Sequence, residues 1–178
     1  MTVTLGTLEL GPLDLSLLGS PVANALAALP DVAAHAHTVA IDPELADTAA
    51  LAAEHGIPPE VSANCVVVLG KRAGEQRAAA CVVLAHTRAD VNGLVRRTID
   101  VRKLSFAPQD WAVNETGMEY GGITPVGLPD GWPLLVDSRV IEQPWVLIGS
   151  GLRRSKLALP GASLADLPNA TVLENLGI

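Results

Sequence analysis

The stretch TGMEYGGITPVGLP, residues 116–129, is rich in glycine and proline and lies between two regions that favour regular structure. The residues before it, from Pro108 on, predict a helix that ends at Gly117, because glycine is common just after a helix. The residues after it predict strands at Leu134–Ile141 and Trp145–Ile148, where apolar and β-branched side chains dominate. So many helix and strand breakers in one run predict a long loop.

A β-hairpin is predicted upstream of this loop. The apolar runs Cys65–Leu69 and Arg77–Ala85 are joined by a polar turn over Gly70–Gln76. A helix is predicted over residues 42–56, from an Asp-Pro start to a glycine. Helices and strands alternate without a regular βαβ period. We therefore predict an α+β fold, in which residues 1–178 form a single compact domain with a central mixed, mainly antiparallel β-sheet flanked by helices.

Charge is distributed unevenly along the chain. The 178 residues are 49% apolar, which is enough for a sizeable core, and the formal net charge is −7. Residues 1–70 hold eight acidic residues and no lysine or arginine, whereas residues 71–108 hold eight basic residues and three acidic ones. Nucleic-acid binding through overall charge is disfavoured, but a local basic face is compatible with this pattern.

The sequence predicts a cytoplasmic protein. A secretory signal needs a positive segment before its apolar run, and the first 70 residues contain no basic side chain. No apolar run approaches the roughly 20 residues that a membrane helix requires. Cys65 and Cys81 lie in apolar runs and are expected to be buried, reduced thiols, and no metal site is expected because their spacing does not suit zinc.

The glycine loop is the most informative candidate for chemistry, because the common nucleotide-binding, metalloprotease and serine-hydrolase motifs are absent. Adjacent glycines at 121 and 122 allow backbone N–H groups to approach a ligand, and Pro125 stiffens the segment. Such a loop can present donors to a carbonyl or phosphate oxygen, although a long surface turn has the same composition. Two basic groups, at 96–103 and 153–156, suit either phosphate contact or a solvated face.

Five segments together resemble the YbaK/prolyl-tRNA synthetase-associated domain family, which comprises aminoacyl-tRNA deacylases and editing domains. They occur in the family's order between residues 30 and 178. The segments are AALAAEHGIPPEVSANCVVVL (49–69), HTRADVNGL (86–94), TGMEYGGITPVGLP (116–129), LLVDSRVIE (134–142) and VLIGSGLRRSKLAL (146–159). Residues 1–30 lie outside the pattern, and VTLGTLEL (3–10) is expected to be an added edge strand or a dimer contact.

The resemblance implies hydrolysis of the ester between a wrong amino acid and the terminal adenosine of a tRNA, without metal, cofactor or covalent nucleophile. Family members position the aminoacyl carbonyl with a glycine-to-proline loop, and water attacks with help from the ribose hydroxyl of the substrate. The catalytic residues expected are Asn64, Gly121, Gly122, Ile123, Thr124 and Pro125. The substrate-binding residues expected are Arg88, Gly127, Ser150, Gly151 and Lys156. The tRNA-contact residues expected are Arg96, Arg97, Arg102, Lys103, Arg153 and Arg154.

Two positions depart from the family pattern. The family has a lysine where Asn64 stands, at the expected contact with the terminal phosphate of the tRNA, and an amide forms weaker bonds to phosphate than a cation does. Lys156 stands where many relatives carry an acidic residue, and it either returns a cation to the pocket or faces solvent. The first hypothesis is therefore a deacylase that acts in trans on mischarged tRNA, with tRNA for proline as the first candidate. The alternative is a weak or inactive relative that serves as a ligand- or tRNA-binding module, and no pattern specifies an oligomeric state.

Overall fold

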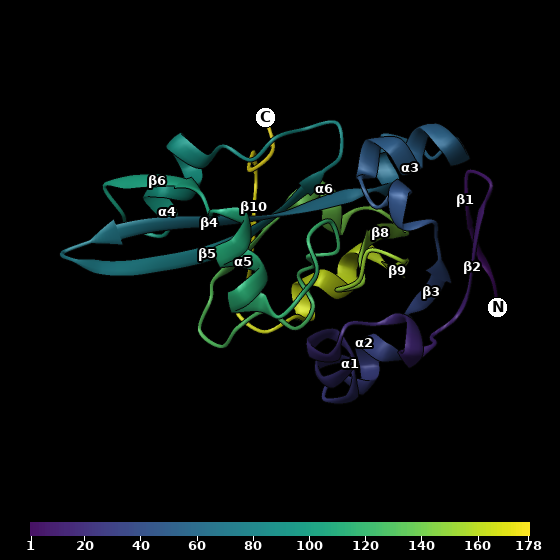
Figure 1. The fold of residues 1–178 in the computed structure, drawn as a ribbon. Helices are drawn as coiled ribbons and strands as arrows, with labels where there is room; N and C mark the ends of the chain where they lie inside the picture. The colour runs from purple at the N-terminus through teal and green to yellow at the C-terminus, as the bar shows by residue number, and fades with distance from the viewer.

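The frame of the molecule consists of two five-stranded sheets in the computed structural model, which describes all of residues 1–178 (Figure 1). The first sheet has the strand order β1-β2-β3-β9-β8, and every neighbouring pair in it is antiparallel. Its strands are β1 Val3–Leu5, β2 Leu8–Pro12, β3 His37–Ala40, β8 Val146–Gly149 and β9 Ser155–Leu159.

The second sheet is mixed and has the order β10-β7-β5-β4-β6. Its strands are β4 Ala63–Arg72, β5 Glu75–Leu84, β6 Lys103–Phe106, β7 Leu134–Asp137 and β10 Ala170–Leu173. β4 pairs antiparallel with β5 and β6, whereas β7 runs parallel to β5 and β10. The two sheets meet where Ser62, just before β4, forms a β-bridge with Leu147 of β8. The α+β class is confirmed, with the strands divided between two sheets rather than gathered in one.

Short helices cover these sheets. The α-helices are α1 Ser20–Ala27, α2 Pro30–Ala33, α3 Thr48–His55, α4 Arg96–Thr98, α5 Gln109–Thr116 and α6 Ser138–Ile141. The 3-10 turns are η1 Leu15–Leu17, η2 Pro43–Leu45, η3 Pro59–Val61 and η5 Gly161–Asp166, and η4 Val91–Val95 is a π-helical turn. None of the helices has the length and apolar character needed to cross a bilayer.

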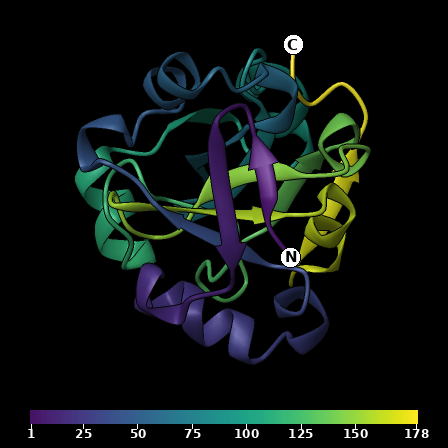
Figure 2. The same ribbon diagram turned by 90° about the vertical axis from the view of Figure 1, so that its right-hand side faces the viewer.

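Aliphatic side chains build the core in three clusters. The largest draws on both sheets and on α1, and includes Val22, Val136 and Leu157. A second lies between the β4–β5 hairpin and η4, and a third lies beneath the hairpin of β1 and β2. That N-terminal hairpin lies across the end of the molecule that faces the viewer in Figure 2, so VTLGTLEL is an edge addition to the first sheet.

The central hairpin and the helix before the glycine loop form as predicted. β4 and β5 pair over ten residues each and are joined by Ala73-Gly74, both with positive φ, so the turn is shorter than expected. α5 ends at Gly117, whose φ of +68° is the left-handed conformation that glycine adopts readily.

Two of the expected elements are wrong, and in both an aspartate is responsible. The helix predicted over 42–56 is split into η2 and α3, because the carboxylate of Asp47 accepts a hydrogen bond from the Ala50 amide and starts a new helix. The strand predicted over 134–141 ends at Asp137, whose carboxylate caps α6 in the same way.

The glycine loop approaches α1 so closely that a side chain at Gly127 has no room. A Cβ there would lie 2.5 Å from the Pro21 carbonyl oxygen, and φ is +86°. Gly131 has a similar φ of +79°, but a Cβ there would meet nothing within 4 Å.

We expect Gly127→Ala to lower the free energy of unfolding by about 2–4 kcal/mol, which combines backbone strain with overpacking. Gly131→Ala is the matched control and should cost only the backbone strain, about 1–2 kcal/mol. Urea denaturation of both variants measures the difference, and equal costs would contradict the close approach to α1.

Candidate active site

A cavity of about 480 Å³ opens between the two sheets. Its walls are the first residues of β4, parts of β8 and β9, the segment from η2 into α3, and the glycine loop. The lining includes Asn64, Tyr120, Gly121, Ile123, Arg153 and Lys156. Residues from five separate parts of the chain therefore converge on one space.

Backbone hydrogen bonds fix the glycine loop against the segment that follows β8. The Gly151 amide donates to the Gly122 carbonyl at 2.7 Å, and the Glu119 amide donates to the Gly151 carbonyl at 3.0 Å. This contact requires small residues, because a Cβ on Gly122 would lie 2.7 Å from the Leu152 backbone and one on Gly149 would lie 2.6 Å from the Gly122 oxygen. The loop is consequently held in place by main-chain atoms on both sides.

The first half of the loop has backbone N–H groups that no protein group accepts. The N–H groups of Gly121 and Ile123 donate to no acceptor in the protein, whereas the Gly122 N–H is bonded to the Glu119 carbonyl at 2.9 Å. Thr124, Pro125 and Val126 are buried and anchor the loop in the interior. Two residues that line the cavity, Gly121 and Ile123, therefore have main-chain N–H donors that the protein does not use. Such donors can stabilise a ligand oxygen that carries negative charge.

Asn64 and Thr48 form one polar wall of the cavity. Asn64 is near the start of β4 and Thr48 is the first residue of α3. The Thr48 hydroxyl donates to the Asn64 Oδ1 at 2.7 Å, which holds the amide in one orientation. The Asn64 NH₂ group has no protein acceptor and is available to a ligand.

Lys156 on β9 places a cation inside the cavity. Its side chain is only 6% exposed, and its Nζ donates one hydrogen bond, to the Ala46 carbonyl at 3.0 Å. Burial lowers the pKa of Lys156 to about 8, with Asp47 acting to raise it and Arg153 to lower it further. An ammonium group has three N–H donors, so two remain for a ligand.

Arg153 and Tyr120 form the mouth of the cavity. The Arg153 guanidinium donates to the Tyr120 carbonyl at 3.1 Å and to the Pro43 carbonyl at 3.0 Å, so it links the glycine loop to η2. Its Cζ lies 6.0 Å from the centre of the Tyr120 ring, and that ring is 56% exposed. The Tyr120 ring is thus largely exposed at the entrance, and one of its faces lies toward Arg153.

The cavity has a thiol but no activated nucleophile. Cys65 contributes to the lining, and burial raises its pKa above the ordinary range, as burial raises the pKa of Cys81 to about 12. Both cysteines are free, as predicted. A thiol with a raised pKa stays protonated at neutral pH and is a poor nucleophile.

Several residues expected at the site lie outside its lining. Ser150 is fully buried, and its hydroxyl bonds the Ser155 hydroxyl at 2.8 Å. Gly151 and Gly127 pack against α1 and the residue before it, where a Cβ would meet Val22 or Pro21. Arg88 is exposed in another hollow, and its backbone pairs with Ile178. Gly122, Thr124 and Pro125 also lie outside the lining, although they belong to the glycine loop.

The expected tRNA-contact residues divide into two groups. Arg153 lines the cavity, whereas Arg154 is exposed and donates to the Ser16 carbonyl at 2.9 Å. Arg96, Arg97, Arg102 and Lys103 lie near β6, at the opposite end of β4 from Asn64. The two basic groups of the sequence are therefore far apart in space.

Sequence reasoning missed five polar residues of the cavity, which are Glu44, Asp47, Thr48, Ser62 and Tyr120. Tyr120 has a signal in the sequence, because it is the one tyrosine of the chain and directly precedes Gly121-Gly122. Thr48 and Asp47 have none, since their Asp-Thr pair has the form of an ordinary helix start.

Comparison with known proteins identifies a family and several similar structures. Residues 42–167 match the aminoacyl-tRNA editing domain family. A crystal structure of a proposed trans-editing enzyme for prolyl tRNA synthetase is 22% identical, with a TM-score of 0.71, and the match covers 88% of this chain and 97% of that one. The hypothetical protein APE2540 is 21% identical, with a TM-score of 0.76 and coverage of 89% and 100%. A scaffold protein from a study of computational epitope grafting is 24% identical, with a TM-score of 0.72 and coverage of 90% and 96%.

We expect Lys156→Met to raise the free energy of unfolding at pH 7 by about 1–3 kcal/mol, because a buried charge is removed. The pKa of Lys156 is lowered in the folded state, so wild type bears the full cost of burying the charge below pH 8. Between pH 8 and the ordinary value of 10.5, the folded protein loses its proton while the unfolded chain keeps it, so wild type becomes relatively more stable.

Urea denaturation of both proteins from pH 7 to pH 10.5 measures this difference. The advantage of the Met variant should shrink over that range. A variant that is less stable than wild type at pH 7 would contradict the burial of a charged ammonium group.

Proposed function

The chain belongs to the aminoacyl-tRNA editing domain family, and we propose that it hydrolyses the ester of mischarged aminoacyl-tRNA in trans. The observation that carries the proposal is the convergence, in one cavity, of two unused backbone N–H donors, a neutral amide and a buried ammonium group. These groups suit a reaction that develops negative charge on a carbonyl oxygen and whose substrate brings a phosphate.

The proposed reaction proceeds by attack of water on the carbonyl carbon of the aminoacyl ester. The carbonyl oxygen becomes an oxyanion, and the N–H groups of Gly121 and Ile123 donate to it. The bond between that carbon and the ribose oxygen then breaks, the ribose oxygen takes one proton of the attacking water, the other proton passes to solvent, and the amino acid leaves as a carboxylate. The neighbouring hydroxyl of the ribose assists the proton transfer, so the protein contributes position and charge stabilisation rather than a nucleophile.

Lys156 supplies the cation that the family pattern places at the position of Asn64. Both side chains line the same cavity, one from β4 of the second sheet and the other from β9 of the first. We propose that the Lys156 ammonium group binds the phosphate of the 3′-terminal nucleotide, with the Asn64 NH₂ group as a neutral second donor. Burying an ammonium group costs stability, and a cost of this kind is common where function requires the group.

Tyr120 and Arg153 are proposed to hold the terminal adenine. The exposed Tyr120 ring offers a stacking face, and base–aromatic stacking contributes about 1–3 kcal/mol per base. The Arg153 guanidinium keeps the loop that carries Tyr120 against η2.

A second candidate function is a binding module that retains the pocket and has lost catalysis. The observation that favours it is Asn64, because the amide brings no charge to the family's phosphate contact. The presence of Lys156 in the same cavity favours the enzyme, since the site does not lack a cation.

Incubation with a panel of mischarged tRNAs is the direct test. We expect release of the amino acid from at least one of them, and the panel begins with mischarged tRNA for proline, because one similar structure is described as a trans-editing enzyme for prolyl tRNA synthetase. Release no faster than spontaneous hydrolysis on every tRNA would refute the enzyme and leave the binding module.

Moving the lysine from position 156 on β9 to position 64 on β4 tests the role of Lys156. Lys156→Met should lower kcat/KM about 10- to 100-fold, which corresponds to a lost charge-assisted hydrogen bond. Addition of Asn64→Lys to that variant should restore a substantial part of the activity. Full activity in Lys156→Met would show that the ammonium group does not contact the substrate.

A further inference from the structure

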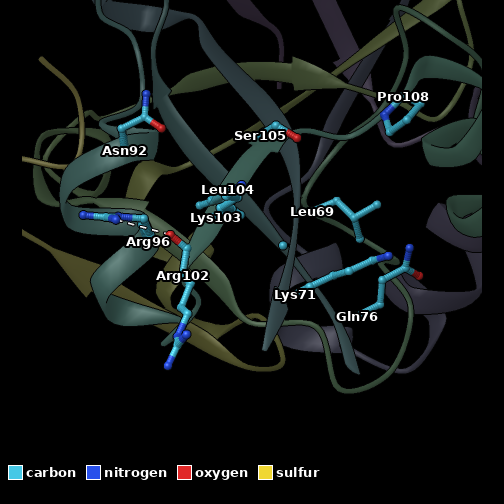
Figure 3. Close-up of a pocket in the computed structure, with 11 residues that line it drawn as sticks. Leu69, Lys71, Gln76, Asn92, Arg96, Arg102, Lys103, Leu104, Ser105 and Pro108 are labelled. Atoms are coloured by element: carbon cyan, nitrogen blue, oxygen red, sulfur yellow. Dashed lines mark hydrogen bonds between the residues drawn. The ribbon is translucent and has the colours of Figure 1, made fainter. Parts of the chain in front are cut away.

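A second cavity, of about 830 Å³, lies at the other end of the β4–β5 hairpin from the candidate active site. It borders β6, the edge strand of the second sheet, and the π-helical turn η4. Figure 3 shows Asn92 and Arg96 on one side of Lys103 and Leu104, and Lys71 and Gln76 on the other. We call this surface the β6 groove.

The charge of the β6 groove is entirely positive. Its lining includes Lys71, Arg96, Arg102 and Lys103 and no acidic residue. None of these four takes part in an ion pair, whereas nearby Arg72 and Arg77 are both paired with Asp100. In a chain of net charge −7, four unpaired cations along one groove are a concentrated site for an anion with several charges.

Arg96 shows that the groove has unused donors. Its Nη1 donates to the Arg102 carbonyl at 3.3 Å, but its Nε is buried without a hydrogen-bond partner. Buried donors are normally paired, so the protein itself leaves the Arg96 guanidinium incompletely hydrogen-bonded. The π-helical turn that positions Asn92 and Arg96 is a rare conformation found often at functional sites.

The separation of the groove from the active site points to one extended ligand. Asn64 and Lys71 are seven residues apart on one strand, which is about 23 Å at the usual rise of about 3.3 Å per residue. In Figure 1 the end of the hairpin, β6 and α4 lie on one side of the molecule, and β8, β9 and α3 lie on the other. A nucleic acid whose 3′ end enters the active site has phosphates at such distances along its backbone.

We propose that the β6 groove binds the sugar-phosphate backbone of the acceptor stem of the tRNA whose 3′ end occupies the active site. This inference rests on the proposed function. The four cations contact phosphates, and the neutral side chains Asn92 and Gln76 contact phosphate or ribose oxygens, so the groove fixes position without reading sequence. Exposed Phe106, the last residue of β6, adds an apolar face at the end of the strand.

Fluorescence anisotropy with two RNAs that carry no amino acid tests the proposal. One is a hairpin minihelix that contains an acceptor stem and a single-stranded 3′ end, and the other is the single-stranded 3′ tetranucleotide alone. The triple variant Lys71→Gln, Arg102→Gln, Lys103→Gln should bind the minihelix about tenfold or more weakly than wild type, with a salt slope reduced by about 2–3. Binding of the tetranucleotide should not change.

Arg72→Gln is the matched control. Arg72 adjoins Lys71 on the same strand, does not line the groove and is already paired with Asp100, so its loss should alter minihelix affinity less than twofold. The proposal would be overturned if the triple variant bound the minihelix with wild-type affinity, or if its affinity fell equally for both RNAs. Wild-type affinity for the minihelix is also the result expected if the groove instead binds a protein.

The test separates the groove from the proposed function. Binding to RNA that carries no amino acid needs no hydrolysis. If the wild-type protein binds the minihelix through the groove but hydrolyses no mischarged tRNA, only the proposed deacylase activity is refuted. A wild-type protein that hydrolyses mischarged tRNA, together with a triple variant that binds the minihelix equally well, refutes only the groove.

Discussion

The close approach of two glycine-containing backbones is the constraint on which the rest of the structure depends. The hydrogen bond from the Gly151 amide to the Gly122 carbonyl joins the glycine loop to the segment after β8. Neither Gly122 nor Gly149 has space for a Cβ. Without this contact the glycine loop would have no fixed position relative to β4 and β9, and Gly121 and Ile123 would not line one cavity with Asn64 and Lys156.

The candidate active site combines this rigid main chain with Lys156, a side chain whose burial costs stability. Two small β-layers enclose the cavity, so Lys156 is removed from water and its ammonium group is less stable in the charged form than in solution. A donor that is shielded from water interacts more strongly with an anion than an exposed donor does, because less water competes for it. The same burial that destabilises the protein would therefore strengthen the phosphate contact that we propose for Lys156.

Local patterns in the chain predicted much of the fold because they depend on neighbouring residues alone. The β-branched apolar run Cys65–Leu69 and the polar turn after it predict the central hairpin, and Gly117 ends α5 because glycine adopts the left-handed conformation readily. Two elements were predicted wrongly where an aspartate inside an apolar run caps a helix, at Asp47 and Asp137. The pairing of β3 with β9, and thus the division into two sheets, joins residues more than a hundred positions apart and has no local signal.

The sequence by itself determined the family and the glycine loop, because these are properties of residue type and order. Only the tertiary structure decided that Lys156 faces the cavity rather than solvent, since that depends on the register of β9 against β3 and β8. It likewise placed Ser150 inside the protein and Tyr120 at the mouth of the cavity. The physical reason is that a side chain's exposure is set by the elements packed around it, and those elements come from distant parts of the chain.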